Sequence, residues 1–333
     1  MNCTCVAPVI ALNNNTAPSA KSYNLFLVYH SPSTCLTMYK HFMIAALLLL
    51  TTNLVCRAQA DFWNSAHAYL GQTPPGDTPK IFAPGLLPDT GIAMDRVAWS
   101  ADGKEFYYCN ALKWFSAGTN KIKYFKYTDH QWKGPFVLTD QYYAPTFSLD
   151  DNTLYLQLNS GEVWQSQRKG KGWSKPELYL KKNYGLYDFM PVQSGAFYVG
   201  SNGNQGSMKD WSTYDFCKFT MSAKDTTIQS LGAPLNTPGF DGDFFIARDE
   251  SYIIISAKET KDFECELYIS YRQNDGSWST PESMGPLINN GTAHRWGQYV
   301  TPDNKYLFYT QGTSEKECHI YWVRFHKPQS NQN

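Results

Sequence analysis

The chain has 333 residues, with 29 basic and 29 acidic side chains and a formal net charge of zero. A neutral chain lacks the excess of lysine and arginine that neutralises phosphates, so we exclude nucleic acid as a partner. Aromatic residues make up 16% of the sequence. Because Tyr, Phe and Trp favour half-buried strands, this composition predicts an all-β protein.

Residues 38–60 have the pattern of a secretory signal peptide. Lys40 and His41 precede an apolar run over residues 42–55, and residues 58–60 form a small-x-small cleavage site. The run is shorter than a comfortable membrane span. We therefore expect cleavage, no integral membrane span afterwards, and a periplasmic or extracellular protein; an uncleaved anchor is the alternative. Met38 opens an ordinary signal sequence, so we interpret residues 1–37 as a non-native upstream extension that is disordered.

After a lead-in over residues 61–78, one unit recurs about every fifty residues. Each copy consists of an apolar or aromatic strand, a tight polar turn and a strand rich in Tyr and Phe. The copies lie at residues 97–108, 146–156, 189–199, 245–255 and 298–309, and the third lacks the Asp-Gly turn signal. A second hairpin follows each full copy, so a unit contains four strands, as one blade of a β-propeller does.

Two residue types in this repeat have a structural interpretation. The turn aspartates are expected to bond their own backbone, namely Asp102, Asp249 and Asp303. The tryptophans of the second hairpins are expected to pack at the outer strand, namely Trp132, Trp173 and Trp278.

The predicted fold class is an all-β propeller of five four-stranded blades over residues 79–327, followed by a disordered tail at 328–333. The fifth unit has only three strands of its own. Residues 79–86 supply its missing fourth strand, which closes the ring and removes an exposed edge. A six-bladed ring is the alternative, if residues 61–95 contain a further unit.

Three segments carry a resemblance to a known family. Residues 99–104, residues 300–308 and the turn at 275–278 resemble the WD40-like β-propeller repeats of the TolB type, found in exported bacterial proteins. Residues 69–76 followed by 81–85 also look like the start of exported propellers of Bacteroidetes-type bacteria. The resemblance covers roughly residues 69–327. It implies a fold but no single activity, because that family includes scaffolds, sugar binders and domains attached to peptidases.

Four cysteines remain after the signal segment, namely Cys109, Cys217, Cys265 and Cys318. In an oxidising compartment they allow two disulfides with three alternative pairings, and buried free thiols are the other interpretation. Their spacing does not suggest a zinc site.

The residues just ahead of each inner strand are polar or aromatic. In a propeller these positions converge on one mouth of the central channel, where convergent polar groups indicate a ligand site. The candidate ligand-binding residues are Asp95, Arg96, Tyr143, Tyr187, Asp188, Asp241, Asp243, His294, Arg295 and Trp296. Long loops expected beside them carry Trp114, Phe115, Trp211 and Phe263. We therefore expect a monomeric binding module for a glycan, a peptide or an envelope protein.

Two other functions stay open at this stage. One is a carbohydrate-active hydrolase or lyase that uses the mouth carboxylates and His294. The other is a scaffold of an envelope complex that binds through its rim. No cofactor is expected, and a divalent cation at Asp241 and Asp243 is the one alternative, although their spacing is not that of a calcium loop. Asp95 and Asp188 also suit a purely structural role as turn or cap residues.

Overall fold

The structure is a computed structural model that describes residues 8–9, 26–27, 62–87, 91–114, 118–222, 225–239, 241–258, 260, 264–314 and 316–327. The chain divides into two units, Met1–Ala58 and Gln59–Asn333. In the first unit, β1 (Pro8–Val9) pairs antiparallel with β2 (Phe26–Leu27). The rest of the predicted extension, the signal segment and the tail at 328–333 lie outside the described residues, so those predictions stay predictions. Among the described residues, no helix combines the length and the apolar character needed to cross a bilayer.

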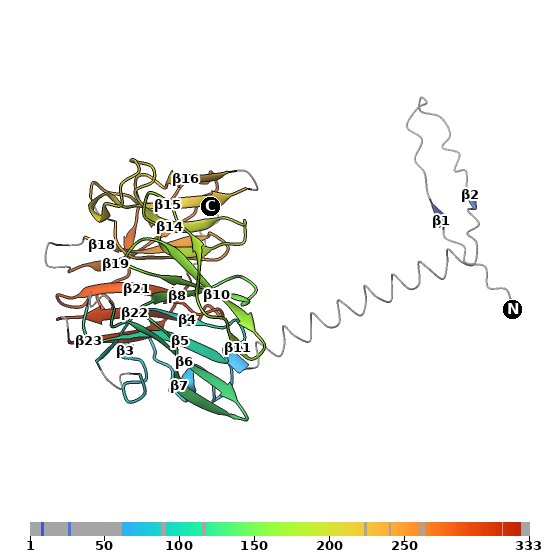
Figure 1. Ribbon diagram of the computed structural model, residues 1–333, viewed down its shortest axis with the longest axis vertical. Coiled ribbons are helices and arrows are strands. Elements are labelled where there is room, and N and C mark those ends of the chain that lie inside the picture. Colours follow the sequence, from blue (N-terminus) through green and yellow to red (C-terminus); the bar gives the residue numbers. More distant parts are fainter. Residues whose placement is uncertain are drawn as a thin grey trace, which may run out of the picture. The chain divides into compact units, whose positions relative to one another are not determined.

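The second unit is a five-bladed β-propeller, which confirms the predicted fold class (Figure 1). Blade 1 contains β4 (Ile92–Trp99), β5 (Glu105–Ala111), β6 (Lys121–Thr128) and β7 (Gln131–Asp140). Blade 2 contains β8 (Tyr143–Phe147), β9 (Thr153–Gln157), β10 (Val163–Lys169) and an outer strand split into β11 (Gly172–Trp173) and β12 (Glu177–Leu180). Blade 3 contains β13 (Tyr187–Pro191), β14 (Phe197–Ser201), β15 (Asp215–Met221) and β16 (Thr226–Ser230).

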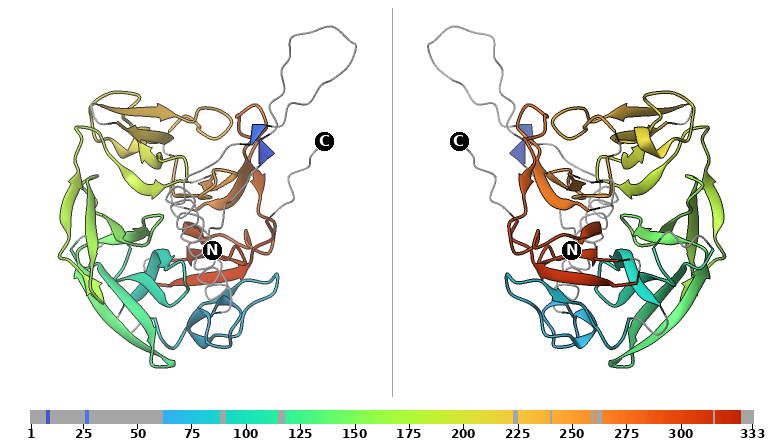
Figure 2. Two further views of the ribbon diagram at one scale, coloured as in Figure 1. Left: turned by 90° about the vertical axis from the view of Figure 1, so that its right-hand side faces the viewer. Right: turned by 90° about the vertical axis from the view of Figure 1, so that its left-hand side faces the viewer.

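Blade 4 contains β17 (Phe244–Ile246), β18 (Tyr252–Ala257), β19 (Glu266–Tyr271) and β20 (Glu282–Ser283). Blade 5 contains β21 (His294–Val300), β22 (Tyr306–Gly312), β23 (Cys318–Arg324) and β3 (Lys80–Ile81). Two 3-10 helices, η1 (Tyr69–Gly71) and η2 (Trp211–Thr213), lie before β3 and between β14 and β15. Figure 2 shows the blades following one another around the ring in chain order.

The N-terminal strand closes the last blade, as predicted. β3 pairs antiparallel with β23, with Ile81 opposite Tyr321 and Lys80 opposite Trp322. The next residue, Phe82, donates its backbone N–H to the Ile320 carbonyl at 2.8 Å. This pairing gives blade 5 its fourth strand and covers an edge that would otherwise be open.

The tight turns form because short side chains satisfy their backbone. In the first turn, the Ser100 hydroxyl donates to Asp102 Oδ1 at 2.7 Å, and the Lys104 N–H donates to the same oxygen at 3.0 Å. The last turn repeats this arrangement, with Thr301 Oγ1 donating to Asp303 Oδ1 at 2.6 Å. The turn aspartates therefore have the structural role that the sequence predicted.

Aromatic side chains fill the space between neighbouring blades. Trp99 is fully buried and packs against Phe106 in its own blade and Phe308 in blade 5. Trp173, in the outer strand of blade 2, donates its indole N–H to the Tyr107 hydroxyl of blade 1 at 2.7 Å. Such contacts explain why the propeller needs so many aromatic residues, because each one buries a large apolar surface between two sheets.

The four cysteines of the propeller are free thiols, and all four are buried. Burial raises the pKa of the Cys109 thiol well above its usual value and that of Cys318 to about 12. The structure therefore agrees with the second interpretation of these cysteines, that of buried free thiols.

Candidate functional site

The inner strands of four blades carry a β-bulge at the same place. The pairing register shifts after Met94 in β4, Tyr143 in β8, Tyr187 in β13 and Trp296 in β21. The next residue of each strand has a left-handed backbone, with φ of +68° at Asp95, +46° at Ala144, +54° at Asp188 and +64° at Gly297. A bulge redirects the side chains around it. As a result, the residue that precedes each left-handed position lines one common cavity.

At one of these bulges, two inner strands approach very closely. A Cβ atom at Gly297 would lie 2.5 Å from the backbone carbon of Asp95, so only glycine fits there. The Thr310 hydroxyl donates to the Asp95 carbonyl at 3.0 Å. A left-handed backbone at a residue other than glycine costs about 1–3 kcal/mol and persists only where its surroundings hold it. The contacts from blade 5 thus keep Asp95 in place at the cavity.

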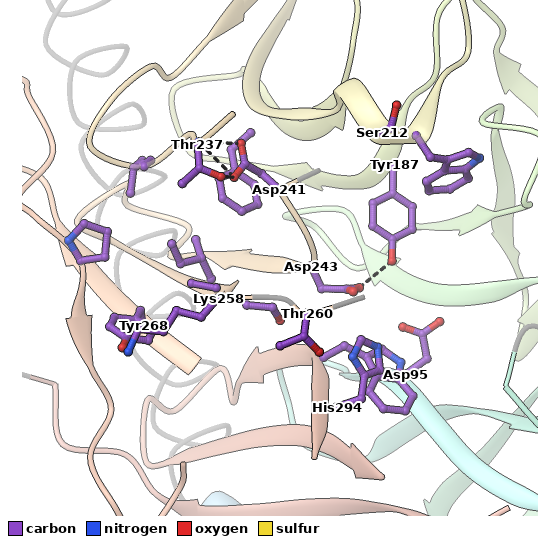
Figure 3. A pocket seen from close by; sticks show the side chains of 18 of the residues that line it. Asp95, Tyr187, Ser212, Thr237, Asp241, Asp243, Lys258, Thr260, Tyr268 and His294 are labelled. Carbon is purple, nitrogen blue, oxygen red and sulfur yellow. Dashed lines mark hydrogen bonds between the residues drawn. The ribbon is translucent and has the colours of Figure 1, made fainter. Parts of the chain in front are cut away.

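The cavity has a volume of about 1030 Å³, and residues from all five blades line it (Figure 3). This volume is at the upper end of the range for small-molecule sites, about 300–1,000 Å³. The aromatic members of its wall are Trp114, Tyr143, Tyr187, Trp211, Phe216, Tyr268 and Trp296. Apart from the tyrosines, the ionisable residues of the wall are Asp95, Asp241, Asp243, Lys258 and His294. The wall therefore combines flat apolar rings with carboxylates.

The structure brings most of the predicted site residues together in this cavity. Those that line it are Asp95, Tyr143, Tyr187, Asp241, Asp243, His294 and Trp296. The other three, Arg96, Asp188 and Arg295, are buried and do not line it. Their side chains pair with other groups of the protein, so these three have no direct access to a ligand in the cavity.

Arg96 and Asp188 form an ion pair that links blades across the channel. Arg96 Nη2 lies 2.6 Å from Asp188 Oδ2, and the side chains are 1% and 0% exposed. The same nitrogen donates to the Phe244 carbonyl at 3.1 Å, so blade 1 is joined to blades 3 and 4. Burial raises the pKa of Asp188, and the Arg96 charge opposes this rise. The pair therefore has a structural role beside the cavity.

Asp243 and Asp95 are the buried carboxyls of the cavity wall nearest this pair. The Tyr187 hydroxyl donates to Asp243 Oδ1 at 2.6 Å (Figure 3). Burial raises the pKa of Asp243 well above its usual value, and the neighbouring charges of Asp188 and Asp95 add to this rise. Burial also raises the pKa of Asp95, to about 6. Both groups thus hold a proton more tightly than an exposed aspartate does.

Asp241 is engaged by its own loop. Its carboxylate accepts the Thr237 N–H at 3.1 Å and the Thr237 hydroxyl at 2.8 Å. Burial raises its pKa to about 6. Within the part of the chain that the structure describes, no group of three His, Cys, Asp or Glu side chains is arranged to hold a metal ion. The cation site considered for Asp241 and Asp243 therefore has no third ligand of these types among the described residues.

His294 lies between aromatic rings. Its ring centre is 4.4 Å from that of Trp296 and 5.6 Å from that of Trp114. Its Nδ1 lies 3.5 Å from Cys265 Sγ. The next residue, Arg295, points the other way because side chains alternate along a strand. Its guanidinium donates to backbone carbonyls, including Cys265 at 2.9 Å, and so organises the adjoining loop.

Some members of the cavity wall had no clear signal in the sequence. Trp114 and Trp211 line it as their predicted loops suggested, while Phe115 and Phe263 lie outside the described residues. Tyr268 and Asn120 also line it, although the sequence analysis did not propose them. Asn120 immediately precedes the third strand of blade 1, and Tyr268 lies within the third strand of blade 4. The sequence signal that points to them is their position just before or within a third strand.

Comparisons with known proteins do not identify a family for this chain. No model of a protein family matches the sequence, and no curated protein matches it. Similar solved structures include TolB from Acinetobacter baumannii, with 12% identity, a TM-score of 0.39, and coverage of 68% of this chain and 54% of that chain. They also include an oligogalacturonate lyase in complex with manganese, with 11% identity, a TM-score of 0.37, and coverage of 72% and 67%.

A third similar structure is prolyl oligopeptidase B from Galerina marginata bound to a 35mer substrate, with 14% identity, a TM-score of 0.39, and coverage of 72% of this chain and 32% of that chain. The chain thus spans about half of TolB and a third of the oligopeptidase. Because no family model matches, the resemblance to WD40-like repeats stays a prediction.

Proposed function

We propose that this protein is an exported binding module that holds a glycan in the cavity at the inner strands. The observation that carries the proposal is the composition of the cavity wall, in which all five blades contribute aromatic rings or carboxylates to one space of about 1030 Å³. A cavity of this size suits a small oligosaccharide better than a single ion.

The chemistry of the wall supports a glycan. An aromatic ring offers a flat apolar face to the C–H face of a sugar, while carboxylate oxygens accept hydrogen bonds from its hydroxyls. Trp211 is 37% exposed, and its ring centre is 5.0 Å from that of Tyr214 and 5.3 Å from that of Tyr187. It is therefore a supported platform with one part open to a ligand.

A binding screen tests this proposal. The full-length protein is titrated calorimetrically with a panel of neutral, acidic and amino oligosaccharides. We expect at least one to bind, and we expect Trp211→Ala to weaken that binding at least tenfold. The control is Phe136→Ala, because Phe136 is an exposed aromatic residue of β7 that does not line the cavity. If a well-folded protein binds no member of the panel, or if both variants bind as tightly as the wild type, the proposal is wrong.

The raised pKa values favour a second candidate, a glycan-active hydrolase or lyase. Burial raises the pKa of Asp95 to about 6 and that of Asp243 well above its usual value, and a general acid must hold its proton in this way. In that case Asp243→Asn would abolish turnover of a bound oligosaccharide while its binding persists. Product analysis by mass spectrometry measures this, and a sugar that binds but is never cleaved would exclude catalysis.

A further inference from the structure

The buried groups at one end of the cavity have an excess of acidic side chains. Asp95, Asp188 and Asp243 come from blades 1, 3 and 4, and all three are buried. One guanidinium, that of Arg96, lies among them, and it pairs with Asp188 at 2.6 Å. Asp95 and Asp243 form no ion pair of their own with another described residue, although the Arg96 charge lowers the pKa of both. Asp95 accepts the Arg96 backbone N–H at 2.7 Å, Asp243 accepts the Tyr187 hydroxyl at 2.6 Å, and both donors are neutral.

Lys258, the lysine of the cavity wall, is engaged outside this acidic group. Lys258 Nζ lies 3.1 Å from the Glu266 carboxylate, and its side chain is largely exposed. The His294 ring is stacked on Trp296, and its Nδ1 faces Cys265. A buried carboxylate without a cationic partner is unfavourable, so it either takes a proton or attracts a cation.

We infer that the glycan held in this cavity carries a protonated amine, which pairs with the carboxylates of Asp95 and Asp243; this inference rests on the proposed function. Burial raises the pKa of both groups, so each can also hold a proton, which compensates its negative charge. An ammonium group would take the place of those protons and supply the missing positive charge.

The surrounding wall suits an organic ammonium group. Tyr143, Tyr187 and Trp296 come from the inner strands of blades 2, 3 and 5 and line the same cavity. Aromatic faces attract an ammonium group through their quadrupoles. Asn120 also belongs to this wall; it is 6% exposed, and its side-chain oxygen accepts no hydrogen bond from a described residue. This oxygen is a further acceptor for an N–H donor.

The arrangement favours an amine over a metal ion. No set of three His, Cys, Asp or Glu side chains with metal-binding geometry occurs among the described residues. A hard divalent cation prefers six or more oxygen ligands, whereas an ammonium group needs only a few acceptors and tolerates aromatic neighbours.

The test compares two sugars that differ in whether their amino groups are acetylated, and therefore in charge. The tetrasaccharide of glucosamine carries amines, and its fully N-acetylated form is neutral. Calorimetric titration of the full-length protein should give at least tenfold tighter binding of the amine form. Raising the salt concentration should weaken the binding of that form alone. Equal binding of both sugars would overturn this inference and leave the glycan proposal standing.

Substitutions test whether Asp95 and Asp243 are the groups that recognise the amine. Asp95→Asn and Asp243→Asn should each weaken binding of the amine form more than binding of the N-acetylated form, so the preference for the amine form should fall at least several-fold. The matched control is Asp140→Asn, because the Asp140 side chain is 67% exposed on β7. An unchanged preference in folded variants would overturn the inference. If a variant fails to fold, the comparison of the two sugars on the wild type still decides.

A third arm separates this inference from the proposed function. The peptide Gly-Lys-Gly carries amines but no sugar. If this peptide binds in a manner that depends on Asp95 and Asp243, and no glycan binds, then recognition of an amine is supported and the glycan proposal is wrong. If neither the sugars nor the peptide bind to a folded protein, this inference is overturned together with the glycan proposal.

Discussion

Replacing Arg96 by methionine should strongly destabilise the propeller. Methionine fills a similar volume but leaves the Asp188 carboxylate, which is fully buried, without its partner at 2.6 Å. Removing one member of a buried ion pair typically costs about 3–5 kcal/mol. An independent bound agrees with this: protonating a carboxyl group of pKa about 3.9 at pH 7 costs about 4 kcal/mol, because each pH unit corresponds to about 1.4 kcal/mol.

Urea denaturation measures this effect through the free energy of unfolding. The double variant Arg96→Met/Asp188→Leu serves as the comparison, because apolar replacement of a whole buried pair is often close to neutral. We expect the double variant to be more stable than the single variant Arg96→Met. A loss below about 1 kcal/mol in the single variant, or additive losses in the double variant, would refute the argument that this pair is a buried cross-channel tie.

The pH dependence of the single variant gives a second check. Burial raises the pKa of Asp188 and Arg96 is the largest of the groups that lower it, so loss of Arg96 raises this pKa further. The folded variant then binds a proton that the unfolded chain releases above about pH 4, so its stability falls as pH increases. The difference in the free energy of unfolding between the wild type and the variant should therefore become smaller by about 1.4 kcal/mol for each unit by which the pH is lowered from 7 to 5. A destabilisation that does not change over this range would contradict the assignment to Asp188.

Three further predictions concern other parts of the propeller. Burial raises the pKa of Asp95 to about 6 and also raises that of Asp243, so the folded protein binds protons more tightly than the unfolded chain. The urea midpoint should therefore fall as the pH rises from about 4 through 6 and beyond. The variant Asp95→Asn/Asp243→Asn should reduce this slope, because Asp188 and Asp241 still contribute to it, and an identical slope in the variant would contradict the prediction. Asp303→Ala should lower the free energy of unfolding by about 1–3 kcal/mol in the same assay, because Asp303 accepts the Tyr69 hydroxyl at 2.5 Å and its loss leaves that donor unpaired. A loss below about 0.5 kcal/mol would argue against this bond. Phe82→Ala should cost about 3–5 kcal/mol, because Phe82 is 1% exposed at the seam that closes the ring, and a small loss would mean that the seam contributes little.

The local architecture could be predicted because its causes are local. Ser100, Asp102 and Lys104 satisfy one another within a few residues, so the turn is visible as a sequence motif. The closing strand was predictable for a different reason, since the fifth unit has three strands of its own and an open edge has to be covered.

The candidate site was only partly predictable from the sequence. Ring geometry brings the starts of the inner strands together, which explains why Tyr187 and Asp243 meet in the cavity wall. The directions of the side chains depend on the bulges, and these rest on left-handed backbone at Asp95 and Asp188. A positive φ at an aspartate has no sequence signal comparable to a glycine. The sequence therefore could not predict that Asp188 lies outside the cavity wall.

The sequence by itself determined that this chain forms a ring of four-stranded blades and how the last one closes, because strand periodicity, turn chemistry and strand counting depend on residues that are close along the chain. The structure decided for five blades over six. Only the tertiary structure decided the partners of the buried charges and the direction in which their pKa values are shifted. Arg96 pairs with Asp188 of blade 3 and with a carbonyl of blade 4, while Asp95 and Asp243 line the cavity and form no ion pair of their own with a described residue. The physical reason is that burial and charge compensation depend on which blades face each other across the channel, and this is a property of the closed ring.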